Sequence, residues 1–146
     1  MAVKSGKGAR NKGAQGEREF LKIITNLLAE RGVTVELRRN YDQTAIGGAD
    51  CLRLPGVAIE VKRQETLELA AWWRQAIDQA ERCEEAIPVL AYRRNKEPWN
   101  VLIPSHLKPN YLRGHVFQKR TGLPTAAVLS VEEFADFYVR DVHQND

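Results

Sequence analysis

The segment DCLRLPGVAIEVKR, residues 50–63, constrains the fold more than any other part of this 146-residue chain. The dipeptide Pro55-Gly56 is a turn signal between two short runs, 50–54 and 57–63, that have strand composition. Alternate side chains of the second run share one face, and that face is apolar: Val57, Ile59 and Val61. An apolar strand face must be covered, so the chain is expected to build a sheet around this segment.

Helical and strand patterns alternate along the rest of the chain. Apolar residues recur at helical spacing from Gln15 to Arg31, before Gly32, and again over 68–84. The other expected strands are 33–38, 87–94, 98–104 and 125–130, with a polar turn at 94–97, an irregular basic stretch at 105–124 and a last helix that begins at Ser130 with a capping box to Glu133. The order predicts an α/β fold (α+β mixed), with helices packed against a mixed sheet.

The composition is that of a single globular domain. Hydrophobic residues make up 43% and charged residues 28% of the chain, which is long enough to bury one core. No apolar run approaches the roughly 20 residues of a membrane span, so no membrane contact is expected. The two cysteines, Cys51 and Cys83, form no CxxC pair, and unpaired cysteines suit a reducing cytoplasm.

The N-terminal residues form a basic segment. The net charge is +3 and the pI is about 9.0, and residues 1–14 carry lysines and arginines among glycines without any acid. Such a segment cannot bury apolar surface, so we expect a flexible basic arm before a single domain at 15–146. The arm is interpreted as a phosphate contact if the domain binds nucleic acid, and otherwise as a solubilising tail.

The charged face of the strand at 57–63 has two interpretations. Glu60 and Lys62 share the face opposite the apolar set, and a solvated strand face would show the same pattern. A tight two-residue turn at Pro55-Gly56 would point Asp50 away from Glu60, whereas a longer connection or a bulge would bring them together. A joint site therefore requires an irregular turn, or an Asp50 that lies just outside the pleat.

Convergence of the two carboxylates would create a site for a divalent cation. Mg²⁺ is commonly held by one or two carboxylates, several waters and a substrate phosphate. A lysine beside such an ion can orient or deprotonate the attacking water and offset negative charge in the transition state. The pattern is thus compatible with phosphodiester hydrolysis.

The order of motifs resembles the PD-(D/E)XK nuclease superfamily. The motifs are KGAQGEREF at 12–20, GGAD at 47–50 and IEVK at 59–62. Over roughly residues 10–104 the chain is similar to the archaeal and phage Holliday-junction resolvase branch of that superfamily. The resemblance implies a restriction-endonuclease-like fold, with a central mixed β-sheet flanked by helices.

The resemblance also implies a set of catalytic and metal-binding residues. Asp50 and Glu60 would ligate Mg²⁺ together with the main-chain carbonyl of Val61, and Mn²⁺ is a candidate substitute. Glu17, on the first helix, would bind the metal directly or through water. Lys62 would position the nucleophile.

A further set of residues is expected near the DNA. These candidates are Lys12, Arg18, Arg38, Arg39, Gln64, Arg93 and Arg94. For the arginines the alternative is a solvated helix, strand end or hairpin tip, and for Lys12 a solubilising tail. Gln64 occupies a place where nucleases of this kind keep a polar residue near the metal, as the resemblance implies. Trp72 and Trp73 lie on an apolar helical stripe and are expected in the core rather than stacked on bases, with at most one of them fully central.

The leading interpretation is a Mg²⁺-dependent endonuclease that cuts four-way DNA junctions. By resemblance it would work as a homodimer, because two symmetric cuts need two active sites, and we expect it in the cytoplasm. The alternatives are a general repair or restriction-like nuclease or nickase, and a DNA-binding module without cleavage. A non-catalytic module has no need for all four of Glu17, Asp50, Glu60 and Lys62, which argues against it.

Overall fold

The structure, a computed structural model, describes residues 6–35, 54–83, 86–113, 115–117 and 125–143, with the backbone alone at 6–14 and 115–117. The predicted mixed α/β fold is confirmed. The elements in order are α1 (Gly6–Glu30), β1 (Val57–Arg63), α2 (Leu69–Glu81), β2 (Ile87–Arg93), β3 (Asn100–Pro104), the 3₁₀ turn η1 (Ser105–Leu107), β4 (His115–Phe117), β5 (Ala126–Ser130), α3 (Val131–Phe137) and the π-helical turn η2 (Tyr138–Val142).

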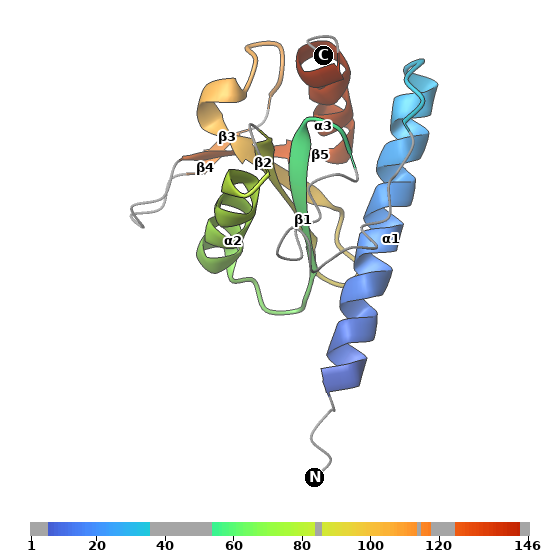
Figure 1. The fold of residues 1–146 in the computed structure, drawn as a ribbon, viewed down its shortest axis with the longest axis vertical. Helices are drawn as coiled ribbons and strands as arrows, with labels where there is room; N and C mark the ends of the chain where they lie inside the picture. Colours follow the sequence, from blue (N-terminus) through green and yellow to red (C-terminus); the bar gives the residue numbers. More distant parts are fainter. Residues whose placement is uncertain (1–5, 36–53, 84–85, 114, 118–124, 144–146) are drawn as a thin grey trace.

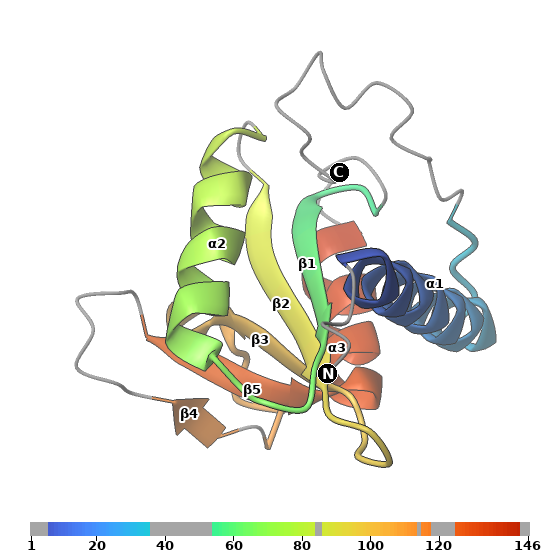
Figure 2. The ribbon, with the colours of Figure 1, turned by 90° about the horizontal axis from the view of Figure 1, so that it is seen from below.

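The strands form one mixed sheet in the order β1-β2-β3-β5-β4 (Figure 1). β1 and β2 are parallel and are connected through α2, whereas the other pairs are antiparallel. Figure 2 shows α2 on one face of the sheet and α1 with α3 on the other. This three-layer arrangement is consistent with a restriction-endonuclease-like fold.

The two faces of β1 contact different helices. Val57 and Ile59 are buried in the cluster that contains Phe20 and Ile24 of α1. Ala58 is buried against Ala80 of α2 instead. The alternation predicted for this strand is therefore confirmed, and the side chains of even-numbered β1 residues project from the face that α2 covers.

Helix α1 packs along the sheet through a continuous apolar stripe. Its fully buried members are Phe20, Ile24 and Leu28. The helix ends as the sequence predicts, because Gly32 has a φ of +80° and the amide of Val33 donates to the carbonyl of Leu28 at 2.9 Å. These bonds satisfy carbonyls that the last turn would otherwise leave without donors.

The start of α1 differs from the prediction. The helix begins at Gly6 and not at Gln15, so its first residues lie in the segment for which a basic arm is expected, and the arm itself stays a prediction (Figure 1). The prediction relied on the absence of apolar residues to bury. A helix that is propagated from a packed segment needs only its own backbone hydrogen bonds, and each further residue adds one of them without a new nucleation step.

Strand β4 and the turn η1 lie in the stretch 105–124, which was expected to be irregular; β4 is a strand because it pairs with β5 at the edge of the sheet. The other elements follow the sequence closely. Helix α2 and strands β2, β3 and β5 lie within the predicted segments, and the capping box is present: Ser130 Oγ accepts from the Glu133 amide at 3.1 Å. Residues 33–35 form no strand, and the rest of that predicted strand lies outside the described residues. None of the described helices is long and apolar enough to cross a membrane.

Two side-chain expectations need correction. Trp72 and Trp73 are each only 3% exposed, so both belong to the core, although at most one was expected to be central. Both can be buried because Trp72 contacts Tyr92, with ring centroids 6.4 Å apart, in a cluster that extends over several strands. Cys83 is disulfide-bonded, contrary to the expectation of unpaired cysteines, while Cys51 lies outside the described residues.

Candidate active site

Glu60 and Lys62 form an ion pair on the α2-facing side of β1. The Lys62 Nζ atom lies 3.2 Å from Glu60 Oε1, and the two side chains are 19% and 18% exposed. They are neighbours because positions two apart on a strand share a face. Partial burial makes each charge dependent on the other, since neither is fully hydrated. The pair is therefore largely buried and is not the solvated strand face that the same sequence pattern could also have formed.

The backbone of β1 turns the Val61 carbonyl towards the outer edge of the strand. The Gly56 carbonyl accepts from the Ile87 amide at 3.0 Å, and the Gln64 amide donates to the Arg93 carbonyl at 3.2 Å. Even-numbered residues between them thus direct their backbone groups to β2, and odd-numbered residues direct theirs away from it. The Val61 carbonyl consequently lies along the edge of β1, which is an edge strand of the sheet that the structure describes.

The Pro55-Gly56 connection is a tight two-residue turn. Leu54 and Val57 form an antiparallel bridge, the Val57 amide donates to the Leu54 carbonyl at 3.3 Å, and Gly56 has a φ of +86°. The turn is therefore not the irregular connection that a ladder-paired Asp50 would need. Asp50 lies outside the described residues, so its place in the site stays a prediction, and it requires Asp50 to depart from a regular ladder.

Glu17 lies on α1 one turn before Phe20, on the stripe that faces the sheet. Its side chain is half-buried, and one of its carboxylate oxygens is fully buried. Helix α1 covers the face of β1 opposite to Glu60 and Lys62. A site shared by Glu17 and these residues must therefore lie around the outer edge of β1, where the Val61 carbonyl points.

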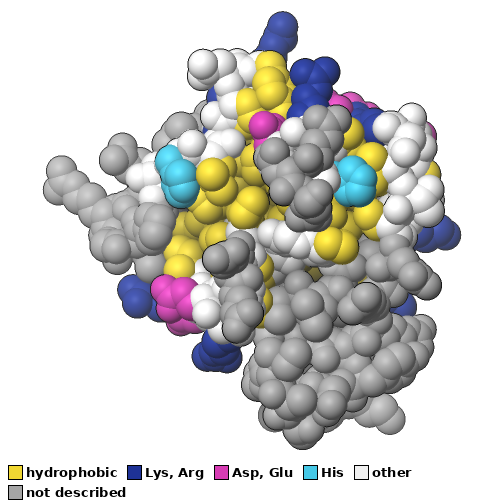
Figure 3. All heavy atoms as spheres, turned by 45° about the horizontal axis from the view of Figure 1, so that its top comes forward, with side chains coloured by type: hydrophobic (Ala, Val, Ile, Leu, Met, Phe, Trp, Pro, Cys, Tyr) yellow, Lys and Arg dark blue, Asp and Glu magenta, His cyan; other side chains and the backbone are white. Residues whose placement is uncertain are grey.

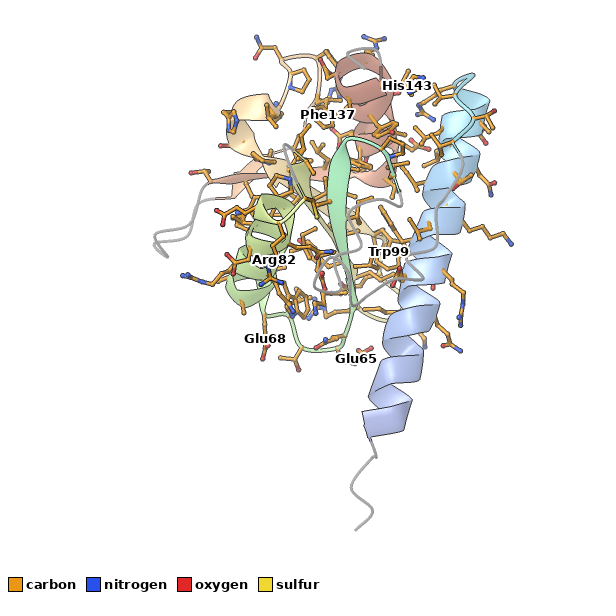
Figure 4. All side chains as sticks on the ribbon, viewed as in Figure 1. Glu65, Glu68, Arg82, Trp99, Phe137 and His143 are labelled. Atoms are coloured by element: carbon orange, nitrogen blue, oxygen red, sulfur yellow. The ribbon has the colours of Figure 1, made fainter. Side chains whose placement is uncertain are left out.

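A second glutamate of α1, Glu19, is the centre of an ion cluster that the sequence did not predict. Its Oε1 atom accepts from Trp99 Nε1 at 3.2 Å and lies 2.9 Å from a terminal nitrogen of Arg93. Its Oε2 atom lies 3.3 Å from a terminal nitrogen of Arg63. Figure 4 shows Trp99 between the sheet and α1. Arg63, directly after Lys62, is the member of the cluster nearest to the predicted motif, but no spacing in the sequence pairs it with Glu19.

The cluster changes the interpretation of the basic β2–β3 turn. Arg93 is held by Glu19 and lies over the Trp99 ring at 5.6 Å, and its side chain is only 14% exposed. Arg94 is exposed but pairs with Glu97 at 2.9 Å. Both arginines were candidates for DNA binding, and both carry out an intramolecular role in the structure. Lys96 is also exposed in this turn and has a φ of 63°.

The other predicted DNA contacts lie in different parts of the chain. Arg18 is exposed on α1, and Gln64 is exposed directly after β1. Lys12 lies within α1, in the part described by its backbone alone, and Arg38 with Arg39 lies outside the described residues. On the face shown in Figure 3, lysine and arginine side chains lie at the margins, while apolar side chains gather between two histidines.

Tyr92 is the neighbour of Lys62 on β2, and its hydroxyl is expected to lose its proton at a higher pH than an exposed tyrosine does. Burial and the negative charge of Glu97 raise the pKa of Tyr92 above its usual 10.0. The unfolded chain therefore ionises first as the pH rises, and its ionisation favours unfolding. The contribution of Tyr92 to stability is present below pH 10 and is lost above it.

We expect the free energy of unfolding of the wild type to fall more steeply above pH 10 than that of Tyr92→Phe. Urea unfolding monitored by circular dichroism between about pH 8 and pH 11 measures both profiles. Other groups titrate equally in the two proteins and cancel in the difference. Parallel profiles of the two proteins would contradict the raised pKa of Tyr92.

The oxygen donors around β1 fit a hard divalent cation. The Glu60 carboxylate and the Val61 carbonyl are ligands of the kind that Mg²⁺ takes, and Mg²⁺ needs few protein ligands because it keeps waters. Among the residues that the structure describes, no group of three or more acidic, histidine or cysteine side chains could hold a metal. The complete set therefore depends on Asp50, which the sequence assigns to it.

One family model matches the chain. It is described as a phage putative PDDEXK endonuclease, and it matches residues 8–123, which include Glu17, Asp50, Glu60 and Lys62. No curated protein and no solved structure matches the chain. Nucleases of this superfamily act on DNA and generally use divalent metal ions. Because the match spans most of the sequence, the chain belongs to the family of phage putative PDDEXK endonucleases.

Proposed function

We propose that this protein is a metal-dependent DNA endonuclease, with Mg²⁺ as the metal, whose preferred substrate is a four-way junction. The observation that supports the nuclease is the half-buried Glu60–Lys62 pair on β1, with the Val61 carbonyl between them turned to the outer edge of the strand. Membership of the endonuclease family supports it. The preference for junctions, and action as a homodimer, rest on the similarity of the sequence to junction resolvases.

The residues divide the chemistry between them. Glu60, the Val61 carbonyl and Asp50 would hold the cation, and Glu17 would face it from α1. The bound ion would polarise the scissile phosphate and lower the pKa of its water. Hydrolysis adds the water oxygen to phosphorus and breaks the bond to the 3′ oxygen, which leaves 5′-phosphate and 3′-hydroxyl ends.

Lys62 has two roles in this scheme. Without a cation its ammonium neutralises Glu60 at 3.2 Å, which relieves the unfavourable burial of a lone carboxylate. During hydrolysis the same ammonium would orient the water or offset the charge on the phosphate oxygens. Because Lys62 lies on the same strand as the proposed metal ligands, its charge can act both in the metal-free site and during hydrolysis without movement of the backbone.

The DNA would approach along α1 and the outer edge of β1. Arg18 and Lys22 are exposed on consecutive turns of α1, and Gln64 is exposed at the end of β1. Lys12 and the neighbouring basic residues of α1, together with Arg38 and Arg39, remain proposed phosphate contacts. Arg93 and Arg94 are weaker candidates because Glu19 and Glu97 already engage them.

A cleavage assay with matched substrates tests the proposal. The wild type and Asp50→Asn are incubated with a synthetic four-way junction and with a linear duplex of the same arm sequence, in Mg²⁺, Mn²⁺ or EDTA. We expect paired cuts in the junction that require the metal and that Asp50→Asn loses. Junction binding by both proteins in EDTA shows that the variant still folds and recognises DNA.

The other outcomes identify the alternatives. Equal cleavage of junction and duplex would overturn the junction preference and leave a general nuclease or nickase. Salt-sensitive binding without cleavage in either metal would leave a DNA-binding module. Retention of full activity by Asp50→Asn would remove Asp50 from the metal site.

A further inference from the structure

We propose that Glu19 is a positioning residue for the reaction at β1. Its carboxylate fixes α1 against the ends of β1 and β2, and it thereby sets the positions of Glu17 and Lys62. The inference rests on the proposed nuclease function. Glu19 itself is not assigned to the reacting atoms.

The contacts of Glu19 join elements that are far apart in sequence. Its two carboxylate oxygens are shared among Arg63 at the end of β1, Arg93 at the end of β2 and the Trp99 indole before β3. Arg63 and Arg93 are 22% and 14% exposed, and their Nε atoms are buried without a hydrogen-bond partner among the described residues. The two arginines thus depend on Glu19 for compensation of their partly buried charge.

The cluster extends to the loops around β1. A terminal nitrogen of Arg63 donates to Asn95 Oδ1 at 3.4 Å, and the backbone N–H of Asn95 donates to Glu65 Oε1 at 3.2 Å. Glu65 lies in the connection between β1 and α2 (Figure 4). The end of β1 is therefore fixed on the α1 side by Glu19 and along the strand by the β2–β3 turn.

The backbones of α1 and β1 approach closely at the same point. A Cβ atom built on Gly16 would lie 2.9 Å from the Cβ atom of Arg63, closer than real Cβ contacts. Gly16 precedes Glu17, and Arg63 follows Lys62. A shift of α1 relative to β1 therefore moves the two proposed catalytic residues relative to each other.

Such a shift is enough to disturb catalysis. Lys62 and Arg63 are consecutive on β1, so movement at the Arg63 contact is transmitted directly to Lys62 and, two residues away, to Glu60. Partners that orient the groups around a metal typically contribute about 10- to 100-fold to metal affinity or activity. Loss of the Glu19 charge is expected to act in this range.

The test compares substitutions at two contacts of α1, one in the middle of the helix and one directly after its C-terminal end. Glu19→Gln keeps an acceptor for Trp99 but removes the charge, and Glu19→Asp keeps the charge on a shorter side chain. Asp136→Asn is the matched control, because it removes an ion pair of 2.7 Å between α3 and Arg31, directly after the far end of α1. Cleavage is measured under single-turnover conditions against Mg²⁺ concentration, below the melting temperature of every variant. Mg²⁺ binding is measured separately by calorimetry, and DNA binding in EDTA.

We expect Glu19→Gln to raise the half-saturating Mg²⁺ concentration, or lower the rate, by about 10- to 100-fold. Glu19→Asp should recover part of this loss, DNA binding in EDTA should not change, and Asp136→Asn should lower only the melting temperature. Should Glu19→Gln or, if it does not fold, Glu19→Asp match the wild type in rate and in Mg²⁺ binding, the positioning role is overturned while the nuclease stands. If the wild type neither cleaves DNA nor binds Mg²⁺, the proposed function fails, and the positioning role fails with it.

Discussion

Glu60→Gln is expected to lower metal-dependent cleavage by on the order of 10²- to 10³-fold or more. Glutamine has the shape of glutamate but no charge, so the site loses a metal ligand of the required kind. The Lys62 ammonium, 3.2 Å away in the wild type, also loses its carboxylate and would repel a cation. Both effects act against metal binding, and the second acts even where the amide oxygen can still coordinate.

Single-turnover cleavage and Mg²⁺ calorimetry measure the two consequences of Glu60→Gln. Glu68→Gln is the matched control, because Glu68 is exposed beyond the end of β1 and makes no side-chain cap to α2 (Figure 4). The control should cleave as the wild type does, and Glu60→Gln should still bind DNA in EDTA. Wild-type cleavage by Glu60→Gln would show that the catalytic carboxylates lie elsewhere in the chain.

Gly56→Ala is expected to reduce the free energy of unfolding by about 2–4 kcal/mol. Gly56 has a φ of +86°, where a side chain causes strain, and a Cβ atom would lie 2.7 Å from a methyl group of Val142. The same turn accepts a hydrogen bond from the buried Tyr138 hydroxyl, which donates to the Pro55 carbonyl at 2.8 Å. Movement that relieves the clash would lengthen this bond.

Gly32→Ala separates strain from clash. Gly32 has a nearly equal φ of +80°, but nothing lies within 4 Å of an added Cβ atom. This control should therefore lose only the strain, about 1–2 kcal/mol. Urea unfolding at neutral pH measures both variants. Equal losses at the two positions would show that η2 does not pack against the turn as the structure has it.

The local rules of the sequence were sufficient for most of the elements. Four predicted features depend only on residues close in sequence, and all four are present. They are the alternation of β1, the apolar stripes of α1 and α2, the end of α1 at Gly32 and the capping box at Ser130. The start of α1 was missed because composition describes what a segment can bury. It does not describe how far a helix continues beyond the segment that is packed on the sheet.

The candidate site divides in the same way. Positions two apart on a strand predicted that Glu60 and Lys62 are neighbours, and the 3.2 Å ion pair agrees. The Pro55-Gly56 turn is tight. The proposed metal site therefore requires Asp50 to depart from the regular pairing that such a turn would extend. Spacing could not give the direction of the Val61 carbonyl, because that depends on which side of β1 pairs with β2.

The sequence by itself determined the mixed α/β class, the order of motifs and the identity of the charged pair on β1, because these are set by local periodicity and residue type. Only the tertiary structure decided what Glu19, Arg63, Arg93 and Trp99 do. These residues lie on separate elements and meet at 2.9–3.3 Å only after α1 has packed on the sheet. A long-range ion cluster has no local pattern, so an exposed basic turn and a buried arginine look alike in the sequence.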